Sequence, residues 1–176
     1  MQQKDFDYNF IEVVCSDLKI IFITDETTRR PGYTNIHMHS FWEMFYLQDG
    51  SLTVHGEDRQ YYLKPKQMII IPPNTYHSTS SDLEVLKKSV FFTFEKVKSN
   101  DKEKLYDFVN KAFCGCGFFK IDDGGYAGVL LDMVLDSYST DKIGKEWRVK
   151  SNVIELIFAL YDIIKEGGAS SPLFDI

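Results

Sequence analysis

Cysteine is scarce in this sequence, with only Cys15, Cys114 and Cys116 among 176 residues. The number is odd, and the N-terminus lacks the apolar stretch of a signal peptide. These features argue against a disulfide framework and predict reduced thiols in a cytoplasm. A thiol metal or redox site needs more ligands than the Cys114-Gly-Cys116 pair supplies, so we interpret this pair as part of a loop.

Long basic runs and long apolar runs are also missing. The net charge is −6 and the pI is about 5.2. Modules that bind duplex DNA usually carry a basic face, so we do not expect this chain to bind DNA by itself. No apolar run is long enough to cross a bilayer, so no membrane partner is expected. The sequence also lacks a glycine-rich phosphate loop and the nucleophile motif of serine hydrolases.

The first half of the chain is rich in aromatic and β-branched residues, which favour strands. The whole sequence holds 14 Phe and 10 Tyr. Turn signals, among them Asp49-Gly50, separate the apolar segments. Several short strands at this spacing predict a mainly β domain, a sandwich or a barrel. The predicted strands cover residues 10–14, 18–24, 36–48, 51–55, 59–63, 68–71 and 89–94.

The second half changes to helical periodicity. Asn100 and Glu103 resemble a capping box for a first helix that reaches Phe113. A short strand at 118–121 and a second helix at 126–138 follow. A third helix is predicted at 146–166, and its apolar stripe consists of Val149, Val153, Leu156, Ile157, Leu160 and Ile164.

Ile154, Phe158 and Tyr161 make the apolar surface of this third helix wider than one packing face needs. We therefore predict a homodimer through residues 146–166, because surplus apolar surface rarely stays exposed. Packing of the helix across the barrel alone is the alternative. Residues 167–176 have the composition of a linker, so we expect a connection toward another domain, with a loose natural tail as the alternative.

One segment of the predicted sheet carries residues suited to chemistry. In a strand at 36–48, His37, His39 and Glu43 have the same parity and share one face. Phe41, Phe45 and Leu47 lie on that face too. A buried glutamate needs a metal, a hydrogen-bond donor or a bound ligand.

His77 follows the Pro72-Pro73-Asn74 turn and can return to the same interior if the strands close into a barrel. Three imidazoles and one carboxylate suit Zn, Ni, Fe, Mn or Cu better than Mg or Ca. Two alternatives stay open: a metal-free pocket in which these groups bind an effector, and a polar core without a ligand. The candidate ligand-binding residues are His37, His39, Phe41, Glu43, Phe45 and His77.

These residues also form known motifs. The pattern H-x-H-x3-E-x6-G, from His37 to Gly50, resembles the first cupin motif, and P-x-N-x2-H, from Pro72 to His77, resembles the second. The resemblance implies a double-stranded β-helix (cupin) barrel over residues 1–98. It also implies that His37, His39, Glu43 and His77 are metal ligands. Lys66 and Asn74 stand where these motifs usually have glycine.

The wider pattern, H-x-H-S-F-W-E-M-F-Y-L-x-D-G followed by L-K-P-K-Q-M-I-I-I-P-P-N-T-Y-H, resembles the sensor half of AraC-type transcription regulators. This implies a barrel that binds a small organic effector, with sugars among the candidates, and no catalytic activity. It also implies a helical dimerisation segment at 99–166 and a linker at 167–176. The DNA-binding domain would lie outside this chain.

Two other functions remain. A metal-dependent cupin enzyme, a dioxygenase or an isomerase, fits the same four ligands. A dimerisation domain with a vestigial pocket is the third hypothesis.

Overall fold

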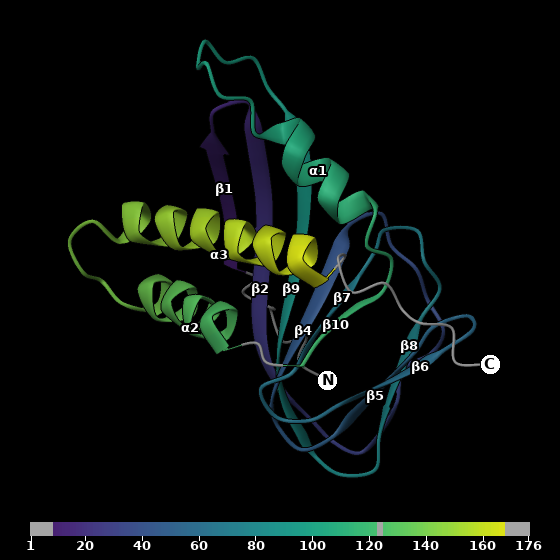
Figure 1. Cartoon of the computed structure of the whole chain (residues 1–176). Helices are drawn as coiled ribbons and strands as arrows, with labels where there is room; N and C mark the ends of the chain where they lie inside the picture. Colours follow the sequence, from purple (N-terminus) through teal and green to yellow (C-terminus); the bar gives the residue numbers. More distant parts are fainter. Residues whose placement is uncertain (1–8, 123–124, 168–176) are drawn as a thin grey trace.

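The computed structural model describes residues 9–122 and 125–167, which form ten strands and three helices (Figure 1). In chain order, the elements are β1 (Asn9–Cys15), β2 (Leu18–Arg29), β3 (Gly32–Tyr33), β4 (Trp42–Asp49), β5 (Leu52–His55), β6 (Gln60–Leu63), β7 (Met68–Ile71), β8 (Ser78–Ser81), β9 (Val85–Lys96), α1 (Tyr106–Cys114), β10 (Phe119–Ile121), α2 (Gly125–Ser139) and α3 (Lys145–Gly167). The predicted mainly β fold with C-terminal helices is confirmed.

The strands form two antiparallel sheets. The larger sheet has the order β1-β2-β9-β4-β7-β10, and the smaller has the order β3-β8-β5-β6. The three helices lie on one side of the larger sheet (Figure 1). β10 comes from the helical half of the chain and pairs with β7 at the edge of the larger sheet. The result is a layer of helices, a large sheet and a small sheet.

Two hydrophobic cores separate these layers. Between the large sheet and the helices lie Met44, Phe92 and the apolar stripe of α3. Trp42 and Tyr46 lie on this side, and the centre of the Trp42 ring is 5.5 Å from that of Phe113 in α1. The second core consists of Phe45, Leu47, Leu52, Val54, Leu63, Ile69, Ile71 and Val85. Its strands come from both sheets, so it fills the space between them.

The strand predicted at 36–48 begins only at Trp42, which corrects the prediction for residues 36–41. β3 belongs to the small sheet and β4 to the large one, so the chain between them must cross from one sheet to the other. This crossover touches the opposite segment through an isolated bridge between His37 and His77. The short strands β3 and β8 were not predicted, and β8 has the polar sequence Ser-Thr-Ser-Ser.

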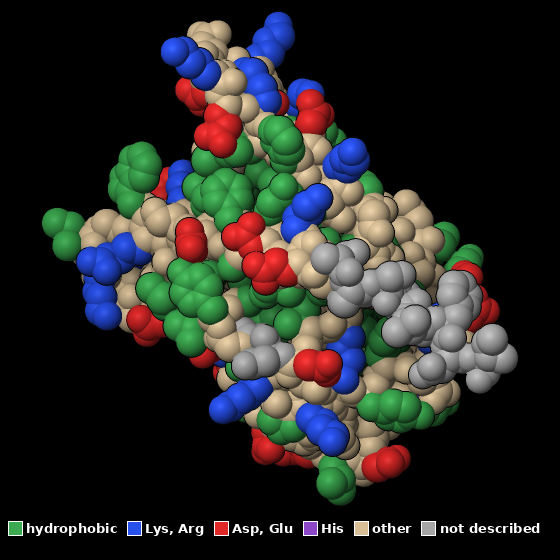
Figure 2. Space-filling model, viewed as in Figure 1, with side chains coloured by type: hydrophobic (Ala, Val, Ile, Leu, Met, Phe, Trp, Pro, Cys, Tyr) green, Lys and Arg blue, Asp and Glu red, His purple; other side chains and the backbone are tan. Residues whose placement is uncertain are grey.

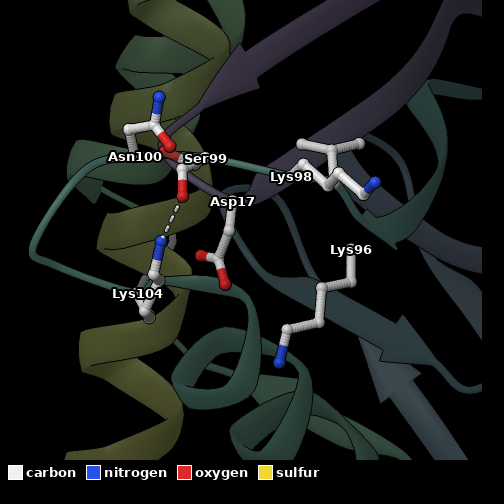
Figure 3. Close-up of a pocket in the computed structure, with 7 residues that line it drawn as sticks. Asp17, Lys96, Lys98, Ser99, Asn100 and Lys104 are labelled. Atoms are coloured by element: carbon white, nitrogen blue, oxygen red, sulfur yellow. Dashed lines mark hydrogen bonds between the residues drawn. The ribbon is translucent and has the colours of Figure 1, made fainter.

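The predicted capping box at Asn100 and Glu103 is also corrected. Helix α1 begins at Tyr106, and Asp17 caps it from the β1–β2 turn. One carboxylate oxygen of Asp17 accepts hydrogen bonds from the amides of Leu105, at 2.7 Å, and Tyr106, at 3.1 Å. Figure 3 shows this carboxylate between the side chains of Lys96 and Lys104. The amide hydrogen bonds, that of Tyr106 first, lower the pKa of Asp17 against the effect of burial.

The apolar stripe predicted for the third helix is buried within the chain, where α3 packs on α2 and the large sheet. The three residues from which the dimer was predicted, Ile154, Phe158 and Tyr161, are half-buried and pack against the same core, and the dimer stays a prediction. Of the predicted linker, only Gly167 falls in the described part, and it ends α3. Among the described residues, no helix is both long and apolar enough to cross a membrane.

Candidate metal and ligand site

Four residues predicted as ligands meet at one end of the space between the sheets. Glu43 is the second residue of β4, and His77 directly precedes β8. His37 and His39 lie on the crossover between β3 and β4. Two backbone hydrogen bonds of 3.0 Å join His37 to His77, and the Asn74 amide donates to the His39 carbonyl at 2.7 Å. These bonds fix the crossover against the segment that carries His77.

The side chains themselves converge on the Glu43 carboxylate. Glu43 Oε2 lies 2.9 Å from Nε2 of His39 and 2.9 Å from Nε2 of His77. The His37 ring lies 4.4 Å from the His77 ring. One ligand atom from each of the four residues lies within 4.8 Å of the other three. The structure therefore brings His37, His39, Glu43 and His77 together; their role as ligands stays a prediction.

Each of the three imidazoles is oriented by a backbone carbonyl two residues away. Nδ1 lies 2.9 Å from the Asn35 oxygen in His37, 2.9 Å from the Phe41 oxygen in His39 and 3.0 Å from the Thr75 oxygen in His77. A carbonyl can only accept, so Nδ1 is the donor in each ring. Nε2 is then the nitrogen that remains for Glu43 or for a metal ion, an orientation typical of metal-binding histidines.

The charges in the cluster favour an ion pair when no metal is bound. Burial alone would raise the pKa of Glu43, but hydrogen bonds from His39 and His77 and the charge of Lys87 outweigh it and lower the pKa to about 2. Burial likewise opposes protonation of His77, yet its bonds to Glu43 and Thr75 raise its pKa above 6.5. Nδ1 of His77 is already a donor, so donation from Nε2 to Glu43 makes this ring an imidazolium.

The donor set fits a transition metal. Three imidazole nitrogens and a carboxylate oxygen are ligands that Zn, Ni, Fe, Mn or Cu accept, whereas Mg and Ca prefer oxygen ligands alone. Ligand bonds to such ions are about 2.0–2.2 Å long, so two ligands of one ion lie at most about 4.4 Å apart. The four ligand atoms, all within 4.8 Å of one another, are near that limit. A bound ion would act as a Lewis acid at this site.

Two aromatic residues predicted in the pocket have different surroundings. Phe41 borders the cluster: its ring stacks on the His39 ring with centroids 4.1 Å apart and stands edge-on to Phe91 at 5.3 Å. Phe45 is buried deeper, in the core between the sheets. The Lys87 ammonium lies 3.4 Å from the centre of its ring. Phe41 is thus placed to contact a ligand at His39, whereas Phe45 belongs to the core between the sheets.

The contribution of β9 to this interior was not predicted from the sequence. Lys87 is buried and donates to the Ser89 hydroxyl at 3.0 Å, and Phe91 lies opposite Glu43 in the sheet. The adjacent Lys88 is also buried, but it lies on the helix side and pairs with Glu26 and Asp132. Two successive lysines in a strand do not reveal which of them faces inward. The signal was therefore ambiguous until the register was known.

His55 and the cysteines lie outside this site. His55 is half-buried and its Nε2 lies 2.7 Å from the Ser80 hydroxyl. Cys15, Cys114 and Cys116 are all free thiols. Burial raises the pKa of Cys116 to about 12, so this thiol stays protonated at neutral pH and is a poor metal ligand.

Comparison with protein families agrees with this geometry. The family described as cupin domain matches residues 28–85, a segment that spans β3 to β8 and contains all four ligand candidates. Over this segment the chain is similar to cupin domains. The cupin resemblance of the two motifs is thereby confirmed, and the regulator resemblance stays a prediction.

Comparison with solved structures gives more distant similarities. A cupin-2 domain containing protein from Shewanella frigidimarina is 18% identical with a TM-score of 0.34, covering 55% of this chain and 85% of its own. AerE from Microcystis aeruginosa is 13% identical with a TM-score of 0.41, over 53% of this chain and 49% of its own. A variant of Bacillus subtilis oxalate decarboxylase is 16% identical with a TM-score of 0.36, over 47% of this chain and 27% of its own. Curated proteins gave no match. Similarities at this level carry no argument about activity.

Proposed function

We propose that this chain is the ligand-sensing domain of an AraC-type transcription regulator, that its cupin barrel holds a transition metal, and that a small organic effector binds beside the metal. The observation that carries the binding role is the convergence of His37, His39, Glu43 and His77 within 4.8 Å. Four protein ligands leave positions open on an ion that accepts five or six. The effector would occupy those positions.

The metal is the first part to test. Protein stripped with a chelator is titrated with Zn, Ni, Fe(II) and Mn separately, and the bound metal is counted after gel filtration. One equivalent of at least one ion, held through gel filtration, is the expected result. Stoichiometric metal that is unaffected when Glu43→Gln and His77→Gln are combined would contradict the assignment of the ligands.

The sensing role is supported by the position of β4 between the site and the helices. Glu43 and Phe45 face the space between the sheets, whereas Trp42 and Met44 pack in the core beneath the helices. A shift of β4 on binding would therefore reach the helical layer directly. The effector must bind one arrangement of that layer more tightly than the other, because equal affinity shifts no population.

The regulator is tested in the protein expressed from the full coding sequence. We expect a helix-turn-helix domain beyond residue 176 and a change in DNA affinity when effector is added. A stop codon at that position would contradict the regulator and leave the metal site standing.

A metal-dependent enzyme, a dioxygenase or an isomerase, is the second candidate. The same open positions on the ion favour it. Oxygen consumption by the Fe(II)-loaded or Mn-loaded protein with a candidate substrate, absent in Glu43→Gln, would support the enzyme over the sensor. Binding of the same compound without turnover would support the sensor.

A further inference from the structure

A cavity of about 370 Å³ adjoins the cluster on the larger sheet. We propose that this cavity holds the apolar body of the effector, a ring or a short branched chain, while one polar end of the molecule reaches His39 or the metal. The inference rests on the proposed function and names the class of its ligand. The cavity is lined by Ile21 and Ile23 of β2, by Phe91, Phe92 and Thr93 of β9, and by Phe41.

The cavity and the cluster share a wall. Phe41 lines the cavity, and its ring stacks on the His39 ring at 4.1 Å with an angle of 5° between the planes. The Phe91 ring stands almost perpendicular to Phe41, at 79°, and also faces His39 at 6.4 Å. The two phenyl rings thus form a corner that opens beside a candidate metal ligand. Thr93 in the lining and His39 beside the two rings offer polar contacts to a molecule seated in this corner.

The lining determines which ligands fit. Thr93 is the only one of the six lining residues with a polar side chain. A sugar carries a hydroxyl on nearly every carbon, and burying those groups without partners costs about 1–3 kcal/mol each. An aromatic or aliphatic body has no polar groups to leave without partners there, and its transfer out of water is favourable. The cavity therefore favours an aromatic or aliphatic acid or alcohol over the sugar considered from the sequence.

The occupant is a small molecule rather than a second protein. A volume of about 370 Å³ lies in the range of small-molecule pockets, about 300–1,000 Å³. The hollow also borders His39, a candidate metal ligand, through Phe41 and Phe91, and a protein partner does not need a metal. Exposed Phe10 and Val14 continue the same sheet face on β1, so a second copy on this face is the competing outcome that the experiment must separate.

The experiment measures benzoate and glucose binding by calorimetry, with the protein both loaded with metal and stripped by a chelator. Ile23→Thr keeps a β-branched residue in the strand and replaces apolar carbon in the cavity with a hydroxyl. Val14→Thr makes the corresponding change on the same face outside the cavity, and is the matched control. We expect wild type to bind benzoate but not glucose, Ile23→Thr to weaken benzoate at least about tenfold, and Val14→Thr to have little effect.

Three results would overturn the inference. They are tighter binding of glucose than of benzoate, equal loss in both variants, and no benzoate binding with a dimer that Ile23→Thr dissociates in sedimentation. The metal titration tests the proposed function separately from these three results. If the protein binds no metal but the stripped protein still binds benzoate, and Ile23→Thr still weakens that binding, the cavity is supported and the metal site is not.

Discussion

The Glu43 carboxylate lies between the imidazoles of His39 and His77 in the space between the sheets. One of its oxygens receives both Nε2 contacts at 2.9 Å, and its side chain is 6% exposed. Glu43 pairs with Phe91 across the neighbouring strand β9, so its neighbours are a phenyl ring and the two histidines. The same atoms that would hold an ion are therefore held together by hydrogen bonds in the metal-free protein.

Substituting one histidine inside the cluster and one outside it separates a loss of metal ligation from general effects of substitution. We expect His77→Gln to weaken metal binding at least about a hundredfold, because it removes a ligand whose side chain is fully buried in the cluster. His55→Gln is the control, since His55 contacts Ser80 and lies outside the cluster. Competition with a chromophoric chelator measures both affinities. Equal losses in the two variants would show that His77 is not a ligand.

The ion pair in the cluster predicts how the metal-free protein responds to pH. The pKa of Glu43 falls from 4.5 to about 2, on the order of 3 kcal/mol, and this contribution exists above pH 4.5 and is lost as the pH falls toward 2. The pKa of His77 is raised above 6.5, so its contribution exists below pH 6.5 and is lost as the pH rises through the folded value.

Urea unfolding of chelator-treated protein at a series of pH values measures this dependence. The two groups together favour a maximum of the free energy of unfolding between about pH 4.5 and 6.5. The Glu43→Gln variant should flatten the curve on both sides. A wild-type curve that the substitution leaves unchanged in shape would refute the ion pair.

Lys66 and Asn74 show how the sequence can depart from a motif and keep its geometry. Both stand where the cupin motifs usually have glycine, and both have positive φ, 70° and 57°. Asn adopts this left-handed conformation more readily than most residues. The loops therefore keep the turn that the motif requires. A residue comparison alone could not show this, because the backbone angle is visible only in the structure.

Strand β4 illustrates which parts of the fold the sequence could predict. Alternation correctly placed Phe45 and Leu47 on one face, which lies between the sheets, and Trp42 and Tyr46 lie on the other face, beneath the helices. The same rule was extended too far, to His37 and His39, where the chain leaves one sheet for the other. These histidines still reach Glu43, because long-range backbone bonds to the segment around His77 hold them there. Local periodicity contains no information about such pairing.

Helix α1 gives a second example of the same limit. Its apolar spacing predicted a helix ending near Phe113, and the helix ends at Cys114. Its beginning was misplaced because the cap comes from Asp17, 88 residues before Leu105. A capping box is a local signal, whereas this cap depends on how β1 and β2 pack beside the helix. The start of the helix is therefore a tertiary feature.

Gly128 allows helix α2 to approach the large sheet closely. A Cβ atom added there would lie 2.8 Å from the Tyr46 ring, which is closer than packed carbon atoms come. We expect Gly128→Ala to lower the free energy of unfolding by about 1–3 kcal/mol despite the better helix propensity of alanine. Urea denaturation measures the change. Tyr46→Leu should recover part of the loss, and a stabilised Gly128→Ala single variant would contradict the close contact.

The surface now favoured for a dimer differs from the one predicted from the sequence. Ile154, Phe158 and Tyr161 of α3 are half-buried against the core, whereas α2 exposes Tyr126, Val129 and Met133 at 60%, 53% and 46%. Trp147, near the start of α3, is 77% exposed. Figure 2 shows hydrophobic side chains gathered over α2 and α3 on the viewed face. We therefore place the proposed homodimer on the outer face of these two helices.

Sedimentation at micromolar concentration tests this dimer. Wild type should sediment as a dimer, and Met133→Lys should raise the dissociation constant at least about a hundredfold, because the charge would be buried in an apolar interface. Phe108→Lys, on the 63% exposed site of α1, is the control. A wild-type monomer, or equal dissociation of the two variants, would exclude the outer face of α2 as the interface.

The four ligand candidates come from both sides of the barrel. Glu43 belongs to the large sheet, while His37 follows β3 and His77 precedes β8, both strands of the small sheet. An ion bound by all of them is therefore a cross-link that opposes separation of the sheets. At a metal concentration a hundred times Kd, amide hydrogens of β5 and β8 that exchange through such opening should exchange about a hundredfold more slowly. Slowing restricted to the residues next to the ligands would show that the two sheets open independently of the ion.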